Sequence, residues 1–76
     1  MIDIEVELYD FPPEVDDGAI IIASYEYNDD GDVYFEVWLR KDGKNIREIT
    51  EDLSDKETNF VKHQIEDFEE KQYCDF

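Results

Sequence analysis

Carboxylates are the only side chains of this sequence that are numerous and regularly spaced enough to suggest a chemistry. Asp and Glu account for 23 of the 76 residues, against 7 Lys and Arg, which gives a formal net charge of -16. Near the N-terminus Asp3, Glu5 and Glu7 alternate with apolar residues, so a strand places them on one face, roughly 6.6 Å apart. Phosphates climb about 3.4 Å per nucleotide along one strand of duplex DNA and lie farther apart in space because they spiral. The three carboxylates therefore form a short row at about the spacing of phosphates.

The acidic charge is concentrated in the first half of the chain. Residues 1–39 contain twelve Asp and Glu and no Lys or Arg, whereas residues 40–76 contain the other eleven acids and all seven bases. The formal charges of the two segments are therefore -12 and -4. This imbalance excludes nucleic acid and anionic membrane as direct ligands and indicates basic partners. The bases that crowd one short stretch predict a single basic corner on an acidic body: Arg40, Lys41, Lys44 and Arg47.

Other site chemistries find little support in the sequence. His63 is the only histidine and Cys74 the only cysteine, so neither a zinc site nor a cysteine–histidine nucleophile can be assembled. Residues 26–31 begin like a calcium loop, but position twelve of that loop falls on Val37 instead of a bidentate glutamate, and a hairpin turn explains the residues better. Carboxylates do acid–base chemistry where their environments push their pKa values apart, and these acids lie on open strands, a turn and a helix surface. We expect no metal, no cofactor and no enzymatic activity.

Two strands joined by an acidic turn organise the chain. Residues 33–39 alternate between apolar and outward-facing positions, and residues 19–27 are rich in the β-branched and aromatic residues that suit strands. The Asp-Gly step in residues 28–32 supplies the positive φ of a short hairpin turn. The turn and the outward positions contribute the following candidate partner-binding residues: Asp29, Asp30, Asp32, Tyr34, Glu36 and Trp38.

The two ends of the chain supply a further strand and a helix. Residues 2–9 alternate as a half-buried strand, and Ser54 with Glu57 forms the capping-box pattern that starts a helix. In that helix Val61, Ile65 and Phe68 fall on one apolar face. Its outer side carries the last candidate residues: Glu66, Asp67, Glu69 and Glu70.

These elements predict an α+β fold in which a three- to four-stranded antiparallel sheet packs one face against a C-terminal helix, within a single domain over residues 1–76. A single helix leaves the second sheet face open, with Tyr9, Tyr34 and Trp38 among the acids. Strand 19–27 is apolar on both sides at its start, so one of its rows needs cover. We expect that cover from a bound protein or from a second copy of the chain.

In size, charge and sheet-plus-helix character, the chain resembles small acidic phage proteins that disarm host defence by imitating DNA. It also resembles the immunity proteins that neutralise nuclease toxins. These resemblances imply an inhibitor that occupies the basic nucleic-acid-binding surface of a restriction or CRISPR effector, or alternatively an immunity protein or antitoxin for a nuclease toxin. A third interpretation, from the residues alone, is an acidic homodimeric adaptor whose charge only confers solubility.

The N-terminal sequence has no basic region, no apolar run of signal-peptide length and no cleavage-site pattern. No stretch has the apolar length needed to span a bilayer. The sequence therefore predicts a cytoplasmic protein, located in the host cytoplasm if a phage encodes it.

Overall fold

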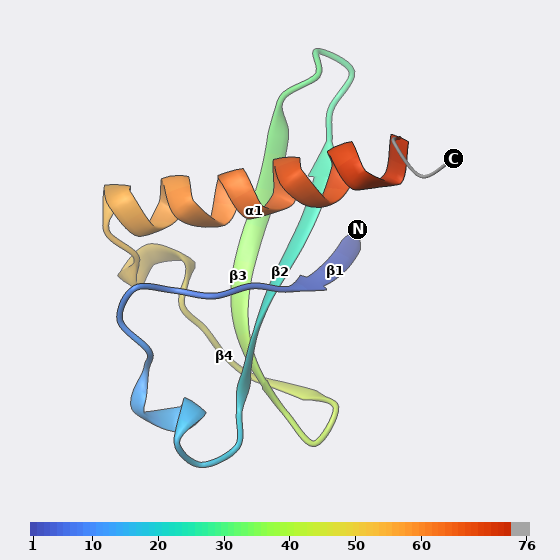
Figure 1. Ribbon diagram of the computed structural model, residues 1–76. Helices are drawn as coiled ribbons and strands as arrows, with labels where there is room; N and C mark the ends of the chain where they lie inside the picture. Colours follow the sequence, from blue (N-terminus) through green and yellow to red (C-terminus); the bar gives the residue numbers. More distant parts are fainter. Residues whose placement is uncertain (74–76) are drawn as a thin grey trace.

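The computed structural model describes residues 1–73 and shows a four-stranded antiparallel sheet, in the order β1-β2-β3-β4, with one long helix across it (Figure 1). This confirms the predicted α+β class. The elements in chain order are β1 (Ile2–Glu5), the 3-10 helix η1 (Pro13–Val15), β2 (Ile20–Tyr27), β3 (Val33–Lys41), β4 (Lys44–Glu48), the 3-10 helix η2 (Thr50–Asp52) and α1 (Asp55–Tyr73).

Two glycine-containing turns connect the three longer strands. In the first, the Asn28 side-chain oxygen accepts hydrogen bonds from the backbone N–H groups of Asp30 (3.0 Å) and Asp32 (2.9 Å), and Gly31 has a φ of 87°. In the second, Asp42 and Gly43 both have positive φ, 53° and 80°. Each turn joins two strands that pair antiparallel, so the predicted hairpin with its turn at residues 28–32 is confirmed. In the second turn, the positive φ at both central residues matches the right-handed twist of the flanking strands. The turns lie at opposite ends of β3.

The core lies between the sheet and α1. Val37 and Leu39 on β3 are fully buried, as are Val61 and Ile65 on α1, so the predicted apolar faces of strand and helix meet. The capping box is half formed, because the Ser54 hydroxyl oxygen accepts the Glu57 N–H at 3.2 Å. The Glu57 carboxylate turns instead toward the backbone N–H of Asp10, at 3.4 Å.

The first strand is shorter than its alternation predicts. Val6 and Leu8 are buried as expected, but β1 ends at Glu5. At the next outward-facing position the carboxamide of Gln64 binds both backbone groups of Glu7: its oxygen accepts the N–H and its nitrogen donates to the carbonyl, each at 2.8 Å. A side chain from α1 thus takes the place of a neighbouring strand.

Tyr9 corrects a second expectation. Instead of joining the open sheet face, its ring stacks on Phe60 of α1, with centroids 4.5 Å apart. The Lys56 ammonium lies 4.6 Å from the centre of the Tyr9 ring. The chain leaves the sheet after β1, so the alternation of residues 2–9 no longer determines which surface Tyr9 faces.

Candidate functional site: the open face of the sheet

The open face consists of the strand side chains directed away from α1. Successive strand residues alternate between the two faces, and the other row of each central strand lies in the core. The register of the four strands gives its members: Asp3, Glu5, Ile20, Ile22, Ser24, Glu26, Tyr34, Glu36, Trp38, Arg40, Asn45 and Glu48. Five of the predicted partner-binding residues meet here: Asp3, Glu5, Tyr34, Glu36 and Trp38.

An ion pair crosses the middle of the open face. The Arg40 Nη2 atom lies 2.9 Å from Oδ2 of Asp3, although the two residues are on β3 and β1, with β2 between them. In the register, Arg40 is opposite Ile20 of β2, and Asp3 is opposite Ser24 of β2. Ile22 therefore lies on β2 midway between the two partners of the ion pair. Ile22 is only 5% exposed. The apolar row of β2 that was expected to need a partner is therefore covered at Ile22 by the chain itself.

The Asp3 carboxylate on this face is held by two hydrogen bonds. Its Oδ1 accepts a hydrogen bond from the Ser24 hydroxyl at 2.5 Å, and its Oδ2 accepts one from Arg40. These two bonds, the first being the larger cause, hold the pKa of Asp3 below its ordinary value of 3.8. Sequence reasoning missed both partners. Arg40 continues the outward alternation of β3 and could have been found by extending the strand by one residue.

The aromatic residues of the open face lie among carboxylates. The Trp38 indole N–H donates to Oε2 of Glu36 at 3.2 Å, so one predicted acid orients one predicted aromatic ring. Trp38 is half-buried, whereas Tyr34 on the same row of β3 is 58% exposed. Glu26 lies directly opposite Tyr34 and is exposed. The β2–β3 hairpin therefore presents two rings and two carboxylates on its open face.

The turn of that hairpin extends the acidic surface. The hairpin projects beyond α1, and Asp29, Asp30 and Asp32 are all exposed at its end (Figure 1). Their carboxylates form no ion pair with Lys or Arg in residues 1–73. The structure thus joins the predicted turn acids to the predicted residues of β3 in one surface, which we call the acidic hairpin surface: Glu26, Asp29, Asp30, Asp32, Tyr34, Glu36 and Trp38.

The helix acids lie elsewhere, because α1 covers the opposite face of the sheet. Glu66, Asp67 and Glu70 are exposed there, and Glu66 is 3.8 Å from His63. Glu69 was predicted on the outer side, but it is half-buried and accepts a hydrogen bond from the Tyr25 hydroxyl at 2.6 Å. The prediction that Glu69 lies on the outer side of the helix is therefore wrong, because its carboxylate points toward the sheet and binds Tyr25 of β2.

The remaining predicted acid lies past the end of β1: Glu7 is exposed, with its backbone bound by Gln64.

The basic corner is partly neutralised. Arg47 pairs with Glu14 and, at 3.2 Å, with Asp52, while Arg40 pairs with Asp3. Lys41 and Lys44 flank the β3–β4 turn, so they lie at the other end of β3 from the acidic turn.

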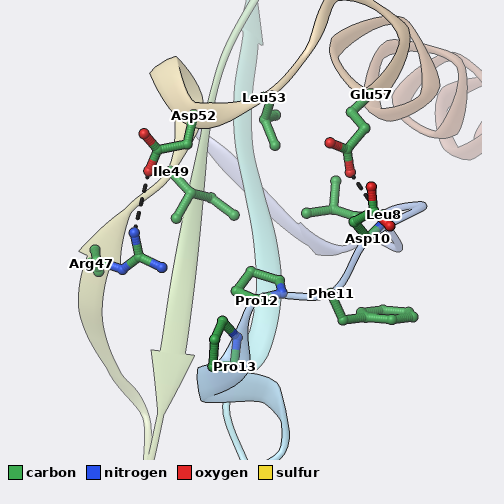
Figure 2. A pocket seen from close by; sticks show the side chains of 10 residues that line it. All are labelled: Leu8, Asp10, Phe11, Pro12, Pro13, Arg47, Ile49, Asp52, Leu53 and Glu57. Carbon is green, nitrogen blue, oxygen red and sulfur yellow. Dashed lines mark hydrogen bonds and ion pairs between the residues drawn. The ribbon is translucent and has the colours of Figure 1, made fainter.

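A cavity of about 300 Å³ opens at the end of the core near the start of α1 (Figure 2). Its floor contains Leu8, Ile49 and Leu53, and its rim contains the Arg47–Asp52 pair on one side and Glu57 near Asp10 on the other. Among residues 1–73, no histidine, serine or lysine lines it. None of its residues was predicted as part of a site, and they come from two stretches that are distant in the sequence, residues 8–13 and 47–57.

Within residues 1–73, no group of three His, Cys, Asp or Glu side chains is arranged to hold a metal ion. Nor does any helix in the described part of the chain combine the length and the apolar character that crossing a bilayer requires. Comparisons with protein-family models, with curated proteins and with solved structures give no significant match.

Proposed function

We propose that this protein is a stoichiometric inhibitor that binds the basic nucleic-acid-binding surface of another protein and offers carboxylates where that protein expects phosphates. The observation that carries the proposal is the lack of neutralisation. Eleven carboxylates were predicted to contact a partner, and among residues 1–73 only that of Asp3 lies within ion-pair distance of a Lys or Arg. An acid that served only to balance nearby bases would be paired.

The acidic hairpin surface is the part of the molecule that best suits this role. It carries the turn acids and two aromatic rings on one continuous surface, and aromatic side chains inside a charged rim are typical of the residues that dominate binding energy. Trp38 is held in place by its bond to Glu36, so little freedom is lost when it is covered. The helix acids face away from this surface and contribute through the long-range field, which speeds encounter with a basic partner.

The chemistry of the partner follows from the charge: a protein with a groove of Lys and Arg that normally holds nucleic acid. Restriction nucleases, CRISPR effector nucleases and nuclease toxins all have such a groove. Binding should be fast and should weaken as salt is added, because screening reduces the steering field.

A competition experiment tests the proposal. Labelled duplex DNA is bound to each of a panel of these nucleases at about 50 mM salt, where electrostatic binding is strong, and the protein is titrated in while the anisotropy of the DNA is followed. We expect at least one nuclease to release its DNA at a stoichiometric amount of the protein. Retention of DNA by every member of the panel would overturn the proposal.

Two matched variants separate a shaped surface from total charge. The triple variant Asp29→Asn, Asp30→Asn, Asp32→Asn removes three charges from the turn and keeps it folded, because the turn is held by backbone N–H groups of Asp30 and Asp32. The control variant removes the same charge from the helix: Glu66→Gln, Asp67→Asn and Glu70→Gln. The turn variant should lose at least about tenfold in inhibition, or ~1.4 kcal/mol, and the helix variant much less. Equal losses would mean that only net charge matters.

The homodimer interpretation has weaker support from the structure. Ile22 is already covered within one chain, so the open face at that position does not require a second copy. A dimer through this face would also bring carboxylates such as Glu26 and Glu36 of two copies together, which is destabilising at close range. Sedimentation at several concentrations checks this: a tight dimer that shields Trp38 from a fluorescence quencher would favour the adaptor.

A further inference from the structure

We propose that the free edge of β1 is a second binding site, which accepts an extended segment of another protein by strand addition. β1 is the first strand in the sheet order and, within the described residues 1–73, has a neighbour on one side only. The Val6 N–H donates to the Ile21 carbonyl on β2 at 3.0 Å, so Ile4 and Ile2, two and four residues before it, also direct their backbone groups toward β2. The intervening residues, Asp3 and Glu5, therefore direct theirs away from the sheet.

The bond between Gln64 and Glu7 shows how this edge is satisfied. Glu7 is the next outward-facing position after Glu5, and its N–H and carbonyl are both bound by the Gln64 carboxamide at 2.8 Å. A carboxamide has the same donor and acceptor as a peptide group. The edge thus already pairs with a peptide-like group at Glu7, and among residues 1–73 no group pairs with the outward backbone groups of Asp3 and Glu5.

A hollow beside the edge has room for side chains of the added segment. It has a volume of about 270 Å³ and lies between β1 and α1. Ile4 and Phe68 are its apolar lining residues, and its polar lining residues are Glu5, Gln64, Asp67 and Lys71. Residues of an added strand alternate between the two sheet faces, so the side chains on the α1 side of the sheet would lie next to this hollow, where Ile4 and Phe68 offer apolar contacts. Those side chains should be apolar.

The other side chains of the segment would lie beside the open face, next to Asp3 and Glu5. The Asp3 carboxylate is paired with Arg40, whereas the Glu5 carboxylate has no Lys or Arg within ion-pair distance among the described residues. A basic side chain on the added strand would neutralise it. The occupant is therefore an extended segment of a different protein in which basic and apolar residues alternate.

A second copy of the chain fits this edge poorly. Pairing β1 with β1 would set Asp3 and Glu5 of one copy beside the same carboxylates of the other, and like charges on neighbouring strands are destabilising. Charged side chains on an edge strand are a known guard against such self-pairing. The inference does not depend on the function proposed above, because it rests on backbone groups and on a hollow that Ile4 and Phe68 help to line, instead of on phosphate imitation.

Amide exchange in the ¹⁵N-labelled protein tests the site directly. The probe is a capped peptide of about eight residues, enough for one strand, in which Lys and Val alternate. We expect slower exchange at the amides of Asp3 and Glu5, and chemical-shift changes at Ile4 and Phe68. Chemical-shift changes confined to Trp38 and the hairpin turn would mean that the peptide binds by charge alone. If the Asp3 and Glu5 amides are protected from exchange without peptide, and sedimentation shows a dimer, a second copy of the chain pairs with this edge. Either result overturns the proposal.

Two controls isolate the backbone contribution. In the protein, Glu5→Pro removes both the outward N–H and the charge, whereas Glu5→Ala removes only the charge. Proline is tolerated on an edge strand when its missing N–H faces solvent. The proline variant should bind the peptide about fivefold more weakly than the alanine variant, the effect of one hydrogen bond. In case Glu5→Pro disturbs β1, the same Lys-Val peptide with alternate backbone nitrogens methylated is tested on the unmodified protein. Equal binding of the methylated and unmethylated peptides would overturn strand addition.

Discussion

Arg40 on β3 reaches across β2 and contacts Asp3 on β1, with its Nη2 atom 2.9 Å from the carboxylate Oδ2. The Arg40 Nε–H donates to the Asn45 side-chain oxygen at 2.9 Å, so the guanidinium is fixed at two points. Its aliphatic stem crosses toward Ile22, which lies midway between the two partners in the register. One side chain of β3 thus binds both edge strands of the sheet, β1 through Asp3 and β4 through Asn45.

We expect Arg40→Ala to reduce the free energy of unfolding by ~1–2 kcal/mol, because it exposes part of Ile22 and leaves Asp3 with one hydrogen-bond donor fewer. Urea denaturation followed by Trp38 fluorescence measures the loss. Lys41→Ala is the control: it removes a neighbouring exposed base and should change stability by less than about 0.5 kcal/mol. Equal effects of the two substitutions would show that Arg40 acts through charge alone.

Acid should weaken the same contact. The pKa of Asp3 is lowered in the folded protein, first by the Ser24 hydroxyl and then by Arg40. A carboxyl group whose folded pKa is depressed contributes stability that is present above its unfolded pKa, here near 3.8, and is lost as the pH falls through the lower folded value. Melting temperatures below pH ~4 should therefore fall more steeply in the unmodified protein than in Asp3→Asn. Parallel curves would contradict the assignment.

Tyr25 joins the sheet to α1 through its bond to Glu69, and its ring is fully buried. Tyr25→Phe removes the donor and leaves the half-buried Glu69 carboxylate without it, which should cost ~1–2 kcal/mol in chemical denaturation. Tyr34→Phe is the matched control, because the exposed Tyr34 hydroxyl lies outside the core. A loss no larger than that of the control would mean that water replaces the bond without penalty.

The same residue predicts an alkaline limit. Burial, and then the Glu69 carboxylate, raise the pKa of Tyr25 well above its ordinary value of 10.0. A tyrosine with a raised folded pKa contributes stability that is fully present below the unfolded pKa and is lost as the pH rises above it. Stability should therefore fall above pH ~10, and Tyr25→Phe should flatten that decline in thermal melts. A decline of the same slope in both proteins would point to another group.

Gln64 fixes the edge of the sheet beyond β1. Gln64→Ala removes both bonds to the Glu7 backbone and should destabilise the protein by ~1–3 kcal/mol, because two backbone groups lose their partner. Lys62→Ala, at an exposed position on the same helix, is the comparison. Amide exchange gives the more specific readout: the Glu7 amide should exchange much faster in Gln64→Ala and unchanged in Lys62→Ala. Unaltered exchange at Glu7 would show that the contact is not made in solution.

Added salt should stabilise the protein. A net charge of -16 on 76 residues repels itself in the compact state, and screening relieves that repulsion. Between about 0.05 M and 0.5 M sodium chloride the melting temperature should rise by ~4–8 °C, the equivalent of roughly 1 kcal/mol in a domain of this size. The Asp29→Asn, Asp30→Asn, Asp32→Asn variant should gain less. A melting temperature that falls with salt would mean that ion pairs such as Arg40–Asp3 outweigh the repulsion.

Local patterns in the sequence determined the class of fold and most of the faces. Period-two alternation specified the buried row of β3 and the burial of Val6 and Leu8, the Asp-Gly step in residues 28–32 specified the first hairpin turn, and the apolar stripe with the Ser54 cap specified α1. Each of these signals is read from neighbours a few residues apart, where backbone geometry alone decides the outcome. The predicted acidic turn and the outward aromatic rings of β3 follow from the same signals.

Only the tertiary structure decided which long side chains reach across elements. Arg40 lies over β2, Glu69 turns inward to Tyr25 and Gln64 binds Glu7, over separations of 37, 44 and 57 residues. Sequence periodicity assigns a side chain to a face, but a long flexible side chain on that face can reach several partners. The partner it meets depends on strand register and on the placement of the helix, which are set by the packing of the whole chain.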